Sequence, residues 1–270
     1  MGSFAETIAV TLMFSIGALL SGCGSETTSA DTKLSDQPVR PVIVELFTSE
    51  GCSSCPPADA LLARLDKEGR IGNAEIIALE EHVDYWDQLG WRDPFSGRQW
   101  TARQEDYAGV FGNAGVYTPQ MIVDGRVEFV GSSQSKARNA IAEAAKETKT
   151  EVAISDVNLA GERLQADIQV KTLPTALTHA ATVWVAVTES GLHSNVKAGE
   201  NAGEDLHHAS VVRSLRKAGE ADSRGEIAYS GKQEVQLDPA WKRENLRLVV
   251  FAQDSKSRHI LGAASARLTE

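Results

Sequence analysis

The sequence predicts an α/β domain over residues 40–150, followed by a mainly antiparallel β-sandwich domain over residues 151–270. Before residue 150, short apolar runs alternate with segments of helical periodicity, a pattern typical of α/β domains. After residue 150, short alternating runs follow one another, at 152–154, 164–170, 183–187, 211–212, 246–251 and 259–261. Strands spaced in this way are typical of an antiparallel sandwich. A chain of 270 residues has room for both.

The first predicted strand and helix enclose a pair of cysteines. Residues 42–47 form an apolar run rich in β-branched side chains, and 48–51 predict a turn. Cys52 and Cys55 follow, directly before a helix whose apolar residues in 58–65 recur at i, i+3, i+4 and i+7. The helix N-terminus favours a thiolate, so we expect Cys52 to be the nucleophile and Cys55 to close a disulfide with it.

A Cys-x-x-Cys pair placed between a strand and a helix favours redox chemistry over half of a metal site. A zinc site would need two more ligands, and the chain has no second Cys-x-x-Cys. A purely structural disulfide is the third interpretation. We therefore expect no metal and no cofactor at this pair.

The rest of the first domain continues in a fixed order. We expect a strand at 74–79, a helix from near 96 to 111, a hairpin over 121–130 with its turn at Asp124-Gly125, and a helix at 135–145. This order matches a thioredoxin-like domain. Thr118-Pro119 then takes the place of a cis-proline loop lying against the dithiol, although an ordinary trans turn is the alternative.

Several long segments resemble a secreted bacterial family known as domain of unknown function 1223, of the thioredoxin-like superfamily. These segments are ELFTSEGCSSCPPADALL, HVDYWDQLGW, TARQEDY, VYTPQMIVDGRVEFVGS and, in the second half, GENAGEDLHHASVVR. The resemblance implies a thioredoxin-like domain followed by a β-rich one. It implies no reaction, because the family's activity is unassigned.

Four polar or aromatic residues are candidates for supporting the dithiol. Glu45, on the first strand, is either a buried proton acceptor for the inner cysteine or an edge residue facing water; Glu50 is expected to face solvent. His82, Asp84 and Trp86 follow the second strand, at the carboxyl end of the strands, where α/β proteins bind ligands. In one interpretation His82 is an acid/base partner or a weak metal ligand, with Trp86 as part of a contact surface; in the other, these residues anchor a long loop.

The second half offers a cluster of histidines and acids, which we interpret as solvated loop residues rather than as a metal site. The cluster comprises His193, Glu200, Glu204, Asp205, His207 and His208. Adjacent histidines on a strand point to opposite faces, and the spacing matches no regular ligand pair. The polar segment 191–206 is expected to be a mobile loop or a binding lip.

The start of the chain predicts export. Residues 1–22 resemble a signal peptide, and Leu20-Ser21-Gly22-Cys23 resembles a lipobox, in which Cys23 becomes the lipid anchor. Residues 23–39 then form a flexible tether. These features predict a lipoprotein of the periplasm, attached to the membrane only by its lipid.

These patterns lead to one principal hypothesis, a thiol–disulfide oxidoreductase of the bacterial cell envelope whose partners are protein thiols or disulfides. A non-enzymatic binding module and a copper-handling protein using Cys52, Cys55 and His82 are the alternatives. The net charge of −10 argues against nucleic acid as a partner.

Overall fold

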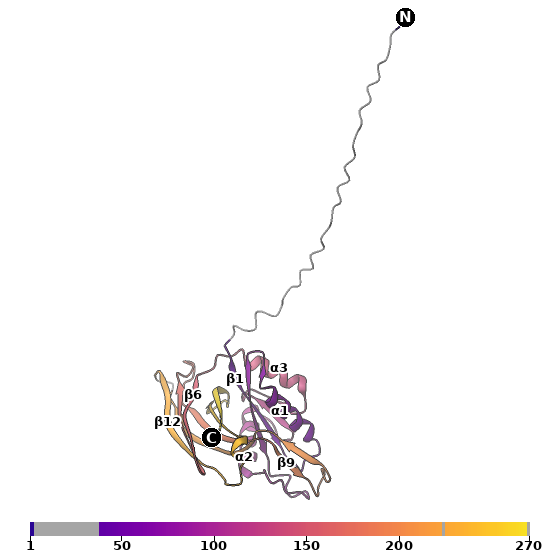
Figure 1. Cartoon of the computed structure of the whole chain (residues 1–270), viewed down its shortest axis with the longest axis vertical. Helices are drawn as coiled ribbons and strands as arrows, with labels where there is room; N and C mark the ends of the chain where they lie inside the picture. The colour runs from indigo at the N-terminus through magenta and orange to yellow at the C-terminus, as the bar shows by residue number, and fades with distance from the viewer. Residues whose placement is uncertain (3–37, 223–224, 269–270) are drawn as a thin grey trace. The chain divides into compact units, whose positions relative to one another are not determined.

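A mixed sheet of nine strands forms the centre of the computed structural model (Figure 1), which describes residues 1–2, 38–222 and 225–268. Eight strands lie in the order β14-β13-β8-β11-β3-β1-β4-β5, and β2 pairs with β3. The strands of this sheet are β1 (Arg40–Thr48), β2 (Arg70–Ile71), β3 (Ala74–His82), β4 (Gln120–Val123), β5 (Val127–Val130), β8 (Ala181–Glu189), β11 (Val211–Ala221), β13 (Leu246–Asp254) and β14 (Ile260–Arg267). β1 and β3 are parallel, as are β3 and β11; the remaining pairs are antiparallel.

Three α-helices in the described ranges cover the two faces of this sheet. α1 (Pro56–Glu68) and α3 (Gln134–Ala144) pack on one face of β1, β3 and β4. α2 (Arg98–Phe111) packs on the opposite face, where Trp100 contacts residues of β8, β11 and β13. The strands between them are buried on both faces, which explains their nearly continuous apolar sequence.

The helix that follows the cysteines is defined by its own sequence. Pro56 and Pro57 occupy its first two positions, where a missing N–H leaves no helical hydrogen bond unmade. Leu61, Leu62 and Leu65 are buried against the sheet. Gly69 ends the helix in the left-handed conformation, with φ of 66°, and its N–H donates to the Leu65 carbonyl.

A second, three-stranded sheet, in the order β12-β7-β6, packs over the other half of the large sheet. Its strands are β6 (Val152–Ala160), β7 (Arg163–Lys171) and β12 (Ile227–Gln236). Alternate residues of β7 face β8 and β13 in a core of small aliphatic side chains. The remaining elements are a two-stranded ribbon of β9 (Leu192–Asn195) and β10 (Asp205–His208), and a short 3₁₀ helix, η1 (Arg243–Asn245).

The predicted fold class is wrong. The structure is mainly β, and a thioredoxin-like α/β domain followed by a separate β-sandwich domain is not what it shows. Asp36–Glu270 form one compact unit, and the large sheet runs across the boundary expected at residue 150. The two halves join where Val211 pairs with Glu80 and the Glu80 N–H donates to the Ser210 carbonyl.

Many individual elements are nevertheless confirmed, including the first strand, all three helices and the 121–130 hairpin. β9, β10 and β12 were not predicted, because their polar residues give no apolar alternation. The expected signal peptide, Cys23 and most of the tether lie outside the described residues. None of the helices in the described ranges is long and apolar enough to cross a membrane.

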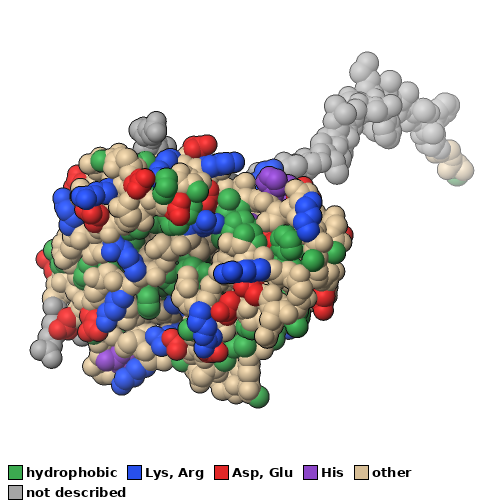
Figure 2. All heavy atoms as spheres, turned by 90° about the horizontal axis from the view of Figure 1, so that it is seen from below, with side chains coloured by type: hydrophobic (Ala, Val, Ile, Leu, Met, Phe, Trp, Pro, Cys, Tyr) green, Lys and Arg blue, Asp and Glu red, His purple; other side chains and the backbone are tan. Residues whose placement is uncertain are grey.

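Basic and acidic side chains are interspersed over the face shown in Figure 2. That face carries no extended basic patch of the kind a polyanion would need. The mixed surface agrees with the overall charge of −10.

Candidate functional site at the Cys52–Cys55 disulfide

Cys52 and Cys55 form a disulfide at the N-terminus of α1. The turn that carries it is closed by two backbone hydrogen bonds, from Cys52 N to Ser49 O and from Cys55 N to Cys52 O, each 3.1 Å. Both cysteines are 0% exposed, whereas the two serines between them are exposed. The disulfide therefore lies just beyond the carboxyl end of β1, where the sequence predicted it, but it is buried beneath the surface.

The peptide bond between Thr118 and Pro119 is cis, as predicted. A Cβ added at Gly131 would lie 3.2 Å from the Ala58 Cβ and 3.3 Å from the Pro119 Cβ, so the proline packs close to the first turns of α1. The Thr118 hydroxyl accepts a hydrogen bond of 2.8 Å from the Trp86 indole N–H. The segments around Trp86, Thr118-Pro119 and Gly131, which are distant from one another in sequence, thus meet beside the dithiol turn.

The segment 196–204, which joins β9 to β10, covers the dithiol turn; we call it the cover loop. The Asn201 side-chain amide donates to the carbonyls of Glu50, at 2.8 Å, and Cys52, at 3.1 Å. A Glu200 carboxylate oxygen accepts from the Ser53 N–H at 3.2 Å. Asn201 is itself buried, so the cover loop is packed against the turn rather than lying loosely over it.

Below the turn, a cluster of buried ionisable side chains connects the two halves of the chain. It comprises Glu50, Asp59, Glu80, His82, Asp93 and His208, all at most 3% exposed. His208 Nδ1 lies 2.7 Å from Glu80 Oε1, and its Nε2 lies 3.2 Å from Glu50 Oε1. His82 Nδ1 lies 2.7 Å from Asp93 Oδ2. Glu50 also accepts from the Trp91 indole N–H, at 2.7 Å.

These contacts shift the pKa values of the cluster in opposite directions. Burial opposes the charge of His82, but the Asp93 carboxylate raises its pKa to about 9. Burial likewise opposes ionisation of Glu80, but the neighbouring His208 lowers its pKa to about 2, and Glu80 in turn raises the pKa of His208. Both shifts favour the charged forms, so each histidine is stabilised as an imidazolium beside a carboxylate.

Asp59 differs from the other acids. It lies four residues after Cys55 on α1, and the Thr48 hydroxyl donates to its Oδ1 at 2.6 Å. Its Oδ2 is buried without a hydrogen-bond partner among the described residues. Burial raises the pKa of this carboxyl to about 7, and the Glu80 carboxylate adds to the rise. Asp59 is thus able to exchange a proton near neutral pH.

The residues predicted to support the dithiol lie in three different places. Glu45 is buried on the α2 face of the sheet, where it accepts hydrogen bonds from Arg103 at 2.6 Å and from Tyr107 at 2.5 Å. Asp84 accepts from the Thr101 hydroxyl of α2, at 2.6 Å. His82 and Trp86 lie near the dithiol turn, in the contacts given above. Glu45 therefore neither faces water nor shares the α1 face with the cysteines.

The predictions for Glu50 and His208 were wrong, since both are fully or almost fully buried instead of solvated. His208 is buried because β10 alternates, with His207 exposed and His208 inward. Asp59 was not singled out at all. An acid within the apolar stripe of an amphipathic helix was a usable signal, because burying a carboxyl is costly unless it has a purpose or a partner.

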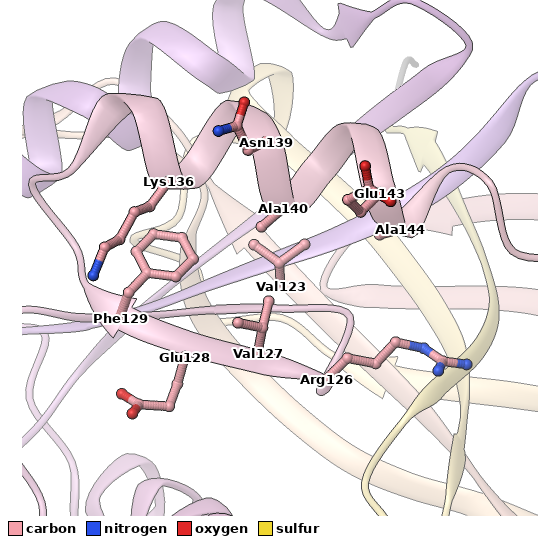
Figure 3. A pocket seen from close by; sticks show the side chains of 10 residues that line it. All are labelled: Val123, Arg126, Val127, Glu128, Phe129, Lys136, Asn139, Ala140, Glu143 and Ala144. Carbon is pink, nitrogen blue, oxygen red and sulfur yellow. The ribbon is translucent and has the colours of Figure 1, made fainter.

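A hollow of the described surface lies elsewhere, away from the dithiol turn. It measures about 530 Å³ between β5 and α3, where Val123, Val127, Phe129 and Ala140 face one another (Figure 3). The charged groups at its margin, including Arg126 and Lys136, extend outward. Its lining holds neither cysteine nor histidine, so it is separate from the dithiol site.

The fold and the buried dithiol site define a mainly β protein with a covered Cys-x-x-Cys turn. The chain belongs to the family described as protein of unknown function (DUF1223), whose profile matches residues 43–253. It is similar to the solved structure of protein AGR_C_4864 from Agrobacterium tumefaciens, at 27% identity and a TM-score of 0.63, over 87% of this chain and 97% of that one.

The chain is also similar in fold to HBP35 of Porphyromonas gingivalis, at 14% identity and a TM-score of 0.63, over 86% of this chain and 76% of that one. No curated protein matches the chain. The comparisons thus establish the family and the fold, and neither brings a reaction.

Proposed function

We propose that the protein carries out thiol–disulfide exchange at Cys52 and Cys55, in the bacterial cell envelope. The observation that carries the proposal is the position of the disulfide. It closes at a helix N-terminus, with the buried Asp59 carboxyl four residues further along the same helix face. A helix N-terminus stabilises a thiolate, and a neighbouring carboxylate can take up the proton of the second thiol.

The exchange occurs in two steps. In the reduced protein, the Cys52 thiolate attacks one sulfur of a substrate disulfide, forming a mixed disulfide and releasing the other substrate sulfur as a thiolate. The Cys55 thiol then loses its proton to Asp59 and attacks Cys52 Sγ. The Cys52–Cys55 bond forms again, and the second substrate thiolate leaves. Two electrons pass to the substrate, and the reverse sequence oxidises a substrate dithiol.

Access to the sulfurs requires the cover loop to move. Both cysteines are fully buried, and Asn201 bonds the backbone of the turn. A substrate chain would have to replace these contacts. The proposal therefore includes an opening of 196–204 before each exchange.

Trapping of mixed disulfides tests the proposal. A Cys55→Ser variant, lacking the resolving thiol, should accumulate a mixed disulfide with a disulfide-bonded peptide or with envelope proteins, whereas Cys52→Ser should not. Asp59→Asn should keep the first step and slow the second roughly 100-fold, the usual contribution of a positioned base. Equal trapping by both cysteine variants, or none by either in a glutathione redox buffer, would refute the assignment.

One observation favours a second candidate, a non-enzymatic binding module with a structural disulfide. It is the complete burial of both cysteines. In that case the disulfide would resist reduction by glutathione until the protein unfolds, and the oxidised form would be the only one populated. The reduction potential, measured by equilibration with glutathione, separates the two functions.

We also propose that the protein reaches the periplasm as a lipoprotein anchored through Cys23. The lipobox-like Leu20–Cys23 segment supports this. Mass spectrometry of the mature N-terminus should find a lipidated Cys23 in the membrane fraction. An unmodified Cys23 in soluble protein would refute it.

A further inference from the structure

Three buried side chains below the dithiol turn bring ligand-type atoms together at one place. They are Glu80 and His82, from the end of β3, and His208, from β10. One ligand-type atom from each lies within 4.8 Å of the other two. We propose that these three side chains form a binding site for a divalent transition-metal ion of the zinc type. The site contains neither cysteine, and the argument for it does not use the thiol exchange proposed above.

The hydrogen bonds of the two histidines orient them as metal ligands. His82 holds Asp93 with Nδ1, at 2.7 Å, while its Nε2 is buried without a hydrogen-bond partner in the described part of the chain. Histidines that bind metals characteristically donate their second ring N–H to a carboxylate, which fixes the ring and its tautomer. The pairing of His82 with Asp93 has this form, and it leaves Nε2 directed at the cluster.

His208 repeats the arrangement from the opposite half of the chain. Its Nε2 lies 3.2 Å from Glu50 Oε1, and its Nδ1 faces Glu80 Oε1 at 2.7 Å. Glu80 is fixed in turn, because its Oε2 accepts the Ala209 N–H at 2.9 Å. His82 Nε2 is therefore the unpartnered atom of the three, while Glu80 Oε1 and His208 Nδ1 are hydrogen-bonded to each other and would exchange that bond for a shared cation.

Two of the three ligand–ligand distances, those from Glu80 to each histidine, can be compared with those around a small ion. Ligands about 2.0–2.1 Å from a tetrahedral metal lie roughly 3.3 Å apart. The Glu80 Oε1 to His82 Nε2 distance is 3.5 Å, close to this value. The Glu80 Oε1 to His208 Nδ1 distance of 2.7 Å must widen by about 0.6 Å.

The chemistry of the ligand set selects the class of metal. Two imidazoles and one carboxylate suit zinc and its neighbours in the transition series, whereas calcium and magnesium prefer oxygen ligands alone. The cluster also holds three further carboxylates, of Glu50, Asp59 and Asp93, against only two imidazoles. A dication bound at this set would take the place of one proton on each histidine, so the net charge of the buried cluster would be unchanged while each imidazole presents a lone pair to the metal.

Titration of the oxidised full-length protein with Zn²⁺, and with Co²⁺ as a spectroscopic probe, tests the site. In the oxidised form the sulfurs of Cys52 and Cys55 are bonded to each other and cannot act as thiolate ligands, and a Cys23→Ser change in the titrated protein removes the third thiol. We expect one ion per chain, with the intense visible bands of tetrahedral Co²⁺. Cys52→Ser/Cys55→Ser protein, titrated alongside, should bind the ion equally well.

Neighbouring residues supply the matched variants. His82→Ala and His208→Ala should each lose at least 100-fold in affinity, and Asp93→Asn about 10- to 100-fold through the loss of ring orientation. His207→Ala, which removes the exposed neighbour of His208, should bind as the unmodified protein does. Far-UV circular dichroism identifies any variant that fails to fold, and Glu80→Gln provides a nearly isosteric replacement.

Absence of stoichiometric binding to the unmodified oxidised protein would overturn the proposal, whatever the variants do. So would binding that persists in folded His208→Ala protein, or that disappears in His207→Ala, because the ion would then sit at the exposed His193–Asp205–His207 group. Failure of thiol exchange, in contrast, would not contradict the proposal of a metal site. The two proposals can therefore fail separately.

Discussion

Replacement of Asn201 by alanine should expose the disulfide without unfolding the protein. The Asn201 amide makes two hydrogen bonds from the cover loop to the backbone of the dithiol turn, at 2.8 and 3.1 Å. A hydrogen bond contributes about 0.5–1.5 kcal/mol net, so opening of the loop becomes easier by about 1–3 kcal/mol. Since 1.4 kcal/mol is tenfold, the open fraction should rise by about 5- to 150-fold.

The rate at which dithiothreitol reduces the disulfide reports this open fraction, provided that the loop closes faster than the reductant reacts. Asn195→Ala is the matched control, because Asn195 is exposed on β9 of the same ribbon. We expect Asn201→Ala to be reduced about 5- to 150-fold faster than the unmodified protein, and Asn195→Ala at an unchanged rate.

The dependence of that rate on urea distinguishes local from global opening. Local opening exposes little surface, so the rate should rise only weakly with urea, with a slope well below the m-value of unfolding. A slope equal to that m-value would mean that the disulfide is reached only through unfolding. An unchanged rate in Asn201→Ala, at unchanged stability, would mean that the cover loop does not control access.

Three further predictions concern stability. Arg103→Met should lower the free energy of unfolding in urea by about 3–5 kcal/mol, because it leaves the buried Glu45 carboxylate of β1 without its ion-pair partner. Arg98→Met is the control: it removes an exposed ion pair and should change stability by less than about 1 kcal/mol. Leu62→Ala should lower the free energy of unfolding by about 2–5 kcal/mol, because it opens a cavity under α1. Leu89 is 55% exposed, so Leu89→Ala should lower it by no more than about 0.5 kcal/mol. Burial opposes the ionisation of Asp254, but a histidine partner lowers its pKa from 3.8 to about 2, so this carboxylate stabilises the fold above pH 3.8 and loses that effect as the pH falls to 2. Asp254→Asn should therefore be less stable by about 1–2 kcal/mol at pH 7, after solvent screening, and should approach the stability of the unmodified protein as the pH falls through and below 2, as followed by thermal unfolding.

Local elements could be predicted because their signals are local. The apolar run of β1, the apolar stripe of α1 and the Asp124-Gly125 turn each depend on neighbouring residues, and each is present. The pairing of strands could not be predicted in this way. β3 and β11 are separated by more than 120 residues, and nothing in either strand's alternation identifies the other as its partner. The expectation of two domains failed at that pairing.

The residues of the site show the same difference between local signals, which could be predicted, and long-range contacts, which could not. Cys52, Cys55 and the Thr118-Pro119 loop were predicted, because their spacing and neighbours carry the signal. Glu45 was predicted as either a buried acceptor for the inner cysteine or an edge residue facing water, and it is neither. Residues 42, 44 and 46 face α1, so Glu45 faces α2 and pairs with Arg103. His208 was misassigned because its partners, Glu50 and Glu80, belong to the other half of the chain.

The position of these partners gives the second half of the chain a direct role at the dithiol. Asn201 bonds the turn from above, while His208 pairs with Glu50 and Glu80 from below. Without His208, two carboxylates would remain buried in a medium of low dielectric with less compensating charge, which is strongly unfavourable. Formation of the β9–β10 ribbon therefore stabilises the acids beneath the dithiol and buries the sulfurs above it in one event. Any partner that lifts the cover loop acts against both sets of contacts, so exposure of Cys52 and rearrangement of the Glu80–His208 pair are expected to be coupled.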